Sequence, residues 1–185
     1  MRKIRLLAFL LLPLALLAIA TTVSAENPEH FHRLFGAHLT GSQEVPPVKT
    51  EARGLALFPL NWAGTELHYG VLATDIISVT AGHIHSGTVG VNGPVVVNLF
   101  SPDACTVQGD RFYCTGTITA EDLVGPLAGQ PLSTLVTMMR DGRTYTNFHT
   151  TAHPGGEIRG QIHRLLAPEY EAVFREAFKD HFVGD

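Results

Sequence analysis

The strongest constraint on the fold is a series of short segments with β-strand character, separated by turn residues. Several of them alternate apolar and polar positions with a period of two, as Leu67, Tyr69 and Val71 do. About eight short strands broken by Gly, Pro and Asn favour an all-β antiparallel Greek-key sandwich or barrel over a parallel sheet. The predicted strands are residues 34–40, 54–62, 66–74, 81–86, 95–100, 111–118, 144–150 and 157–163. Pro59 predicts that its strand lies at a sheet edge or at a bulge.

Three segments have helical character. Thr119 and Asp122 resemble an N-terminal cap, and the apolar spacing from Pro131 to Asp141 predicts a short helix. Residues 168–185 have an apolar face of helical period and a charged remainder. This C-terminal amphipathic helix is expected to dock on the sandwich, with a partner or a membrane surface as the alternative.

Residues 1–25 are typical of a secretory signal peptide. A basic start precedes an apolar stretch over residues 6–19, and Val23-Ser24-Ala25 has the small residues of a cleavage site. An uncleaved anchor is the alternative, but Pro13 and the short apolar core count against it, because a span needs about 20 apolar residues. We therefore expect an extracytoplasmic protein, periplasmic or secreted, with no stable membrane span after cleavage.

The remaining chain, about 160 residues, suits one domain. The net charge of the whole sequence, −4, includes the basic leader, so the mature protein is more acidic still, and nucleic-acid binding is not indicated. An even cysteine count in an oxidising compartment favours a disulfide between Cys105 and Cys114 that staples a hairpin. A cysteine-based metal site is the weaker alternative, because two thiolates lack the usual spacing.

Two histidines dominate the candidate chemistry. His83 and His85 share one face of a predicted strand, about 7 Å apart, while Ile84 points into the core between them. His149 is expected to add a third imidazole from a strand not adjacent to theirs. Neutral imidazole suits several transition metals and binds copper most tightly. The alternative is an exposed polar face on which the histidines only form hydrogen bonds.

Other polar residues near His149 are candidates for accessory roles. His153 could complete the site or be solvated. Arg159 could clamp an anion or carboxylate beside the imidazoles, with Glu157 as a hydrogen-bond partner of a ligating histidine. The structural alternative is an ion-pair network, with Glu44 or between these residues, that keeps the last strand in register. Tyr145 and Asn147 are expected to face the same way as His149, because the three residues are two positions apart along one strand.

Three blocks of the sequence resemble the CHRD domain, which is named after chordin and also occurs in exported bacterial proteins. The blocks are residues 35–48, the His83-Ile84-His85 segment with Gly90-Val91-Asn92-Gly93-Pro94, and residues 147–162. They occur in order, and the resemblance covers residues 34–163. It implies an extracytoplasmic β-rich domain and leaves function to be argued from the site.

A second resemblance is to copper-zinc superoxide dismutase. It implies that His83, His85 and His149 correspond to copper ligands and Arg159 to the anion-guiding arginine. The sequence lacks that enzyme's zinc loop rich in His and Asp and its metal-bridging histidine. This resemblance therefore implies a superoxide-dismutase-like fold and a mononuclear site more than it implies dismutation.

Taken together, these features predict an exported CHRD-domain protein that binds a metal ion, copper favoured, in extracytoplasmic metal handling or redox protection. The main alternative is an interaction module that binds an extracytoplasmic protein or a surface polymer. A further alternative is an enzyme like superoxide dismutase, which requires an open copper position and an accessible Arg159.

Overall fold

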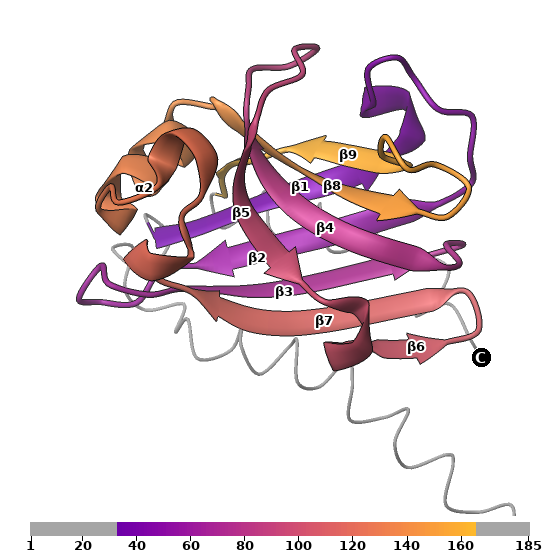
Figure 1. The fold of residues 1–185 in the computed structure, drawn as a ribbon, viewed down its shortest axis with the longest axis horizontal. Coiled ribbons are helices and arrows are strands. Elements are labelled where there is room, and N and C mark those ends of the chain that lie inside the picture. Colours follow the sequence, from indigo (N-terminus) through magenta and orange to yellow (C-terminus); the bar gives the residue numbers. More distant parts are fainter. Residues whose placement is uncertain (1–32, 166–185) are drawn as a thin grey trace, which may run out of the picture.

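The computed structural model describes residues 33–165, which form one antiparallel ten-stranded sheet that curls around the main apolar core (Figure 1). Nine strands follow the order β5-β4-β8-β9-β1-β2-β3-β7-β6, and β10 pairs with β1. The predicted all-β antiparallel class is confirmed. The strands are β1 (Leu34–Thr40), β2 (Arg53–Pro59), β3 (Leu67–Thr74), β4 (Val79–Ser86), β5 (Val95–Phe100), β6 (Thr106–Gln108), β7 (Arg111–Ile118), β8 (Thr144–Thr150), β9 (Ile158–Gln161) and β10 (His163–Arg164).

Two strands were not expected as such. β6 has three exposed residues, so it carries no alternation of buried and exposed positions that a sequence pattern could reveal. The predicted segment 157–163 divides into β9 and the two-residue β10. The edge position inferred from Pro59 is wrong, because β2 lies between β1 and β3. Pro59 is tolerated there because it is the last residue of β2, beyond Leu57, where the pairing with β3 ends.

The sheet curls so that strands at its two ends meet. The Tyr69 hydroxyl in β3 donates a hydrogen bond to the Leu99 carbonyl in β5. The rings of Phe100 in β5 and Phe112 in β7 are 4.9 Å apart. The main apolar core fills the inside of this curl, and its fully buried members include Phe35, Leu39, Phe58, Val71, Ile84, Phe112, Phe148 and Ile158. The curled sheet therefore encloses the core like a barrel, and polar side chains can lie on its outer face.

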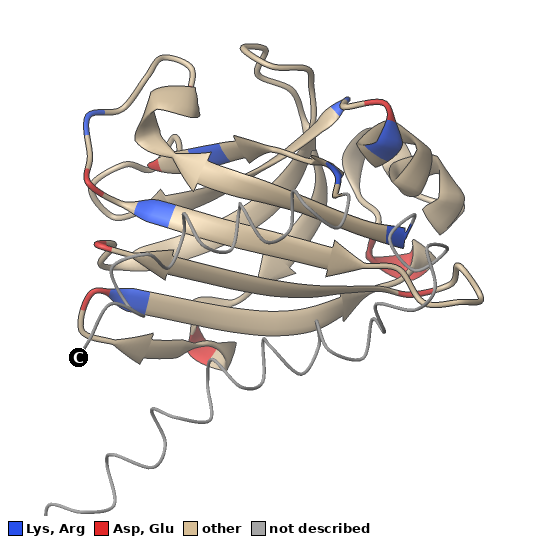
Figure 2. Cartoon of the chain, turned by 180° about the vertical axis from the view of Figure 1, so that it is seen from behind, with Lys and Arg blue, Asp and Glu red and all other residues tan. Residues whose placement is uncertain are grey.

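β1 and β2 are buried on both faces. Their inward residues belong to the main core, whereas Leu34, Leu55 and Leu57 form a second cluster with Leu165. Figure 2 shows that the charged residues in this view lie mainly in loops and near strand ends. The strand interiors are therefore built almost entirely from apolar and neutral polar side chains.

The predicted helix forms as α2 (Leu132–Arg140), directly after Pro131 and before Asp141. It lies at one end of the curled sheet and buries its apolar face there (Figure 1). Thr119 and Asp122 form a capping box on a 3₁₀ turn, η4 (Ala120–Asp122). The other 3₁₀ turns are η2 (Gly41–Gln43), η3 (Pro102–Ala104) and η5 (Gly125–Leu127).

The disulfide between Cys105 and Cys114 is confirmed. Cys105 immediately precedes β6 and Cys114 lies in β7, with their Cα atoms 4.7 Å apart, so the bond staples the β6–β7 hairpin. The predicted signal peptide over residues 1–25 and the amphipathic helix over residues 168–185 lie outside the described residues.

Candidate metal centre

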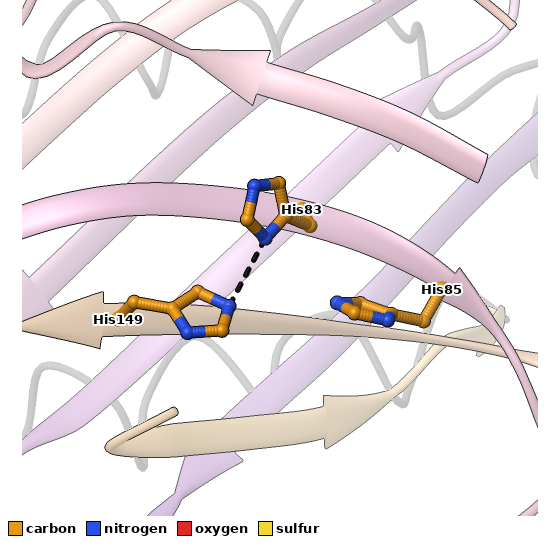
Figure 3. A group of neighbouring side chains, drawn as sticks. All are labelled: His83, His85 and His149. Atoms are coloured by element: carbon orange, nitrogen blue, oxygen red, sulfur yellow. Dashed lines mark hydrogen bonds between the residues drawn. The ribbon is translucent and has the colours of Figure 1, made fainter. Parts of the chain in front are cut away.

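The pairing of β4 with β8 gathers His83, His85 and His149 on the outer face of the sheet. In this register His83 lies opposite Asn147 and Ala81 lies opposite His149, so His149 is the diagonal neighbour of His83. Figure 3 shows the three rings side by side along these strands. The prediction of a strand not adjacent to β4 is wrong, since β8 is its direct neighbour.

The three rings converge through their nitrogen atoms. One nitrogen from each ring lies within 4.8 Å of the other two. His83 Nδ1 and His149 Nε2 are 3.0 Å apart (Figure 3). Ile84 is fully buried on the opposite face, as the alternation of β4 predicts. A rigid two-strand ladder therefore holds three nitrogen donors in one place.

Backbone carbonyls set the tautomers of two of the rings. His149 Nδ1 lies 2.8 Å from the Pro154 carbonyl, and His85 Nδ1 lies 2.9 Å from the Gly93 carbonyl. A carbonyl only accepts hydrogen bonds, so each Nδ1 is the protonated donor and the lone pair of each neutral ring is on Nε2. Hydrogen bonds of this kind commonly orient metal-ligating histidines.

The surroundings keep two of the imidazoles uncharged. Burial, followed by the nearby His149 and His85 charges, lowers the pKa of His83 from 6.5 to about 4. Burial also lowers the pKa of His85, although its hydrogen bond to Gly93 opposes this. At neutral pH both rings therefore offer a lone pair, which a metal ion requires.

The His85 ring stacks on Tyr145, which in turn stacks on the Arg159 guanidinium. The ring of Tyr145 lies 4.8 Å from that of His85, at an interplanar angle of 7°. The guanidinium carbon of Arg159 lies 3.4 Å from the centre of the Tyr145 ring. This cation–π contact and the stack support one side of the three-histidine group.

Arg159 pins a loop rather than facing the imidazoles. It is 1% exposed and donates to the Asn92 side-chain oxygen and to the carbonyls of Thr88 and Val91. These acceptors belong to the β4–β5 loop, residues 87–94, which also contains Gly93. The described residues contain no ion pair between Arg159 and Glu44. Arg159 therefore holds in place the loop that orients His85.

Glu157 and His153 lie outside the group. The Glu157 carboxylate accepts hydrogen bonds of 2.7 Å from the hydroxyls of Thr50 and Thr150. The backbone N–H of His153 donates to Thr150 Oγ1. The structure thus brings together the three predicted histidines but neither of these accessory candidates.

Sequence reasoning missed the two carbonyls that orient the rings, at Gly93 and Pro154, because every residue carries a carbonyl and none is distinctive. Tyr145 and Asn147 were predicted to share the face of His149, and their positions in the β8 register agree. Asn147 also interacts with the Glu44 carboxylate. This contact had no sequence signal, because the two residues are far apart in the chain.

The fold and site together define an all-β domain with three convergent imidazoles on its outer face. The CHRD domain model matches residues 35–162, more than half of the chain, and the chain therefore belongs to the CHRD domain family. No curated protein and no solved structure matches the chain. Within residues 33–165, no helix is long and apolar enough to cross a membrane.

Proposed function

We propose that this protein is an exported CHRD-domain protein that binds one metal ion, copper favoured, through His83, His85 and His149, and acts in extracytoplasmic metal handling or redox protection. The observation that carries the proposal is the convergence of the three rings, two of which have their Nε2 lone pairs set by backbone carbonyls.

The spacing of the nitrogens suits one metal ion. Metal–imidazole bonds of about 2.0–2.1 Å put tetrahedral ligand nitrogens about 3.4 Å apart. The His83–His149 pair is already at 3.0 Å, and the widest separation is at most 4.8 Å. Small side-chain rotations close this gap. A metal between these two nitrogens would require His83 to take its other neutral tautomer, in which the proton is on Nε2 and the Nδ1 lone pair faces the metal.

The donor set supports the choice of metal. Three imidazole ligands with no thiolate or carboxylate suit a borderline ion, and copper binds most tightly among the divalent metals at a given nitrogen site. Three protein ligands also leave a coordination position for a further ligand, as in catalytic rather than structural sites.

Export is supported by two observations. Cys105 and Cys114 form a disulfide, and disulfides persist mainly in oxidising compartments. The first 25 residues have the pattern of a cleaved secretory leader.

The alternatives have less support. A superoxide-dismutase-like enzyme requires an accessible Arg159, but this guanidinium is buried and bonded to the β4–β5 loop. An interaction module that binds an extracytoplasmic protein or a surface polymer does not require imidazole lone pairs to converge.

A titration of the metal-free protein tests the proposal. Cu(II) and Zn(II) are titrated into residues 26–185 and followed by calorimetry. We expect one copper per chain, bound more tightly than zinc, and a loss of at least a hundredfold in affinity in His83→Ala and His149→Ala. His153→Ala is the matched control and should bind like the unmodified protein. Equal binding in all four proteins would refute the site.

A further inference from the structure

The side-chain amide of Asn147 is buried beside the three histidines and is not one of the proposed metal ligands. Asn147 lies opposite His83 in the β4–β8 ladder and is 3% exposed. Asn147 lies two positions before His149 in β8, so the two side chains lie on the same, outer face of the sheet. A buried amide on this face must find partners for both its nitrogen and its oxygen.

The nitrogen end of this amide faces Glu44. A Cβ added to Gly156 would overlap both Glu44 Oε1 and Asn147 Nδ2, so both atoms pack against this glycine, and the Asn147 amide interacts with the Glu44 carboxylate. Glu44 is 6% exposed. Burial raises its pKa, while the Asn147 amide and the charge of Arg159 oppose that rise. A carboxylate only accepts hydrogen bonds, so it selects the amide orientation in which Nδ2 points toward it.

The oxygen end is therefore left for the metal centre. Asn147 Oδ1 and His85 Nε2 are both buried, and neither forms a hydrogen bond of normal geometry within the described part of the chain. His85 donates through Nδ1 to Gly93, so its Nε2 has a lone pair. The Asn147 side chain lies within interaction distance of His85. Two buried acceptors this close need a donor or a cation between them.

We propose that Asn147 is a positioning residue of the metal centre. Its Oδ1 accepts a hydrogen bond from a protic ligand, of which water is the simplest, at the open fourth position of a metal held by His83, His85 and His149. Glu44 fixes the amide so that the oxygen faces this position. The inference rests on the proposed metal function and adds which ligands the metal accepts.

This arrangement selects among ligands. A ligand with a proton, such as water or an alcohol, can donate to Asn147 Oδ1, whereas azide has no proton and meets an oxygen lone pair. Arg159 directs three of its N–H groups to the β4–β5 loop, and its charge, which reaches His85, acts on anions in the unmodified protein and in an Asn147 variant alike. The site should therefore favour neutral protic ligands over anions.

Azide binding to the copper-loaded protein tests the inference. The azide-to-copper charge-transfer absorbance is measured for the unmodified protein and for Asn147→Leu, which removes the acceptor at similar volume. We expect azide to bind about fivefold more tightly to the variant, the effect of about one hydrogen bond. Copper affinity should change much less than in His83→Ala.

Asn98→Leu is the matched control. Asn98 lies opposite His83 on the other side, in β5, and is exposed, so its azide affinity should equal that of the unmodified protein. If Asn147→Leu does not fold, as judged by thermal unfolding, Glu44→Gln replaces it. A glutamine can donate or accept, so the Asn147 amide loses its fixed orientation and azide binding should tighten by a smaller factor.

The outcomes separate this inference from the proposed function. Unchanged azide affinity in Asn147→Leu, or in Glu44→Gln where that variant stands in, overturns the inference while the metal site remains. An equal change in Asn98→Leu overturns it as well. Loss of copper from Asn147→Leu would make Asn147 a direct ligand and also overturns it. If the unmodified protein binds no copper, the proposed function itself fails.

Discussion

His83 Nδ1 lies 3.0 Å from His149 Nε2, although 66 positions separate the two residues in the chain. The contact exists because β4 and β8 are direct neighbours in the sheet, with His149 one step diagonal to His83. Since His149 Nδ1–H donates to the Pro154 carbonyl, His149 Nε2 is the acceptor and His83 Nδ1 the donor of the contact between the two rings. Without metal, an N–H···N hydrogen bond therefore joins the His83 and His149 rings.

The low pKa of His83 predicts acid sensitivity. Its value of about 4 in the folded protein lies below the ordinary 6.5, so the unfolded chain binds the proton more readily between these pH values. The metal-free protein should be most stable above pH 6.5 and lose about 2 kcal/mol as the pH falls to 4, once solvent screening is allowed for. Urea unfolding at several pH values measures this. His83→Gln should flatten the dependence, and an equally steep dependence in that variant would contradict the assignment.

Arg159→Lys should loosen the β4–β5 loop. A lysine cannot replace a guanidinium that donates to Asn92, Thr88 and Val91 at once. We expect a loss of about 2–3 kcal/mol in the free energy of unfolding and faster amide exchange over residues 87–94. Copper affinity should also fall, because Gly93 in this loop orients His85.

Arg53→Lys is the matched control for that variant, since Arg53 is exposed at the start of β2. Its stability should change by less than about 0.5 kcal/mol. Unchanged exchange over residues 87–94 in Arg159→Lys would show that the loop is held by other contacts.

Gly93→Ala should damage the metal centre without touching a ligand. A Cβ at this position would overlap the Ser86 carbonyl, so the loop backbone must move. The Gly93 carbonyl that orients His85 moves with it. We expect copper affinity to fall about tenfold, as is typical when a partner of a ligating histidine is lost. Gly155→Ala, where a Cβ meets nothing within 4 Å, should bind copper normally.

Replacing both cysteines by serine should lower stability and spare the site. The disulfide closes a loop between residues nine positions apart, and its loss should cost about 2–3 kcal/mol in chemical denaturation. The β6–β7 hairpin meets β5 only inside the curl, where Phe112 packs against Phe100, whereas the three histidines lie on the outer face of β4 and β8. Copper affinity should therefore stay within error, and a marked loss would indicate that the hairpin supports the centre.

Much of the secondary structure could be predicted because its signals are local. Four strands, β1, β5, β7 and β8, have the predicted bounds, since the alternation of buried and exposed positions is a property of neighbouring residues. α2 begins after Pro131 for the same kind of reason. β6 was not predicted, because all three of its residues are exposed and show no alternation of buried and exposed positions.

The site was predictable in composition but not in arrangement. Spacing alone put His83 and His85 on one face, and the family resemblance added His149. The assigned roles of Arg159 and Glu157 depended on which groups would meet them. In the structure, Arg159 donates hydrogen bonds to the β4–β5 loop, and Glu157 accepts hydrogen bonds from two threonine hydroxyls.

The sequence by itself determined most of the strands with their inward and outward faces, the disulfide partners and the pairing of His83 with His85 on one face, because each follows from short-range pattern or residue chemistry. The tertiary structure decided that β8 lies beside β4, that the β4–β5 loop covers Arg159, and that Glu44 reaches Asn147. These contacts join residues far apart in the chain, and strand pairing and loop packing depend on the whole core rather than on any local pattern.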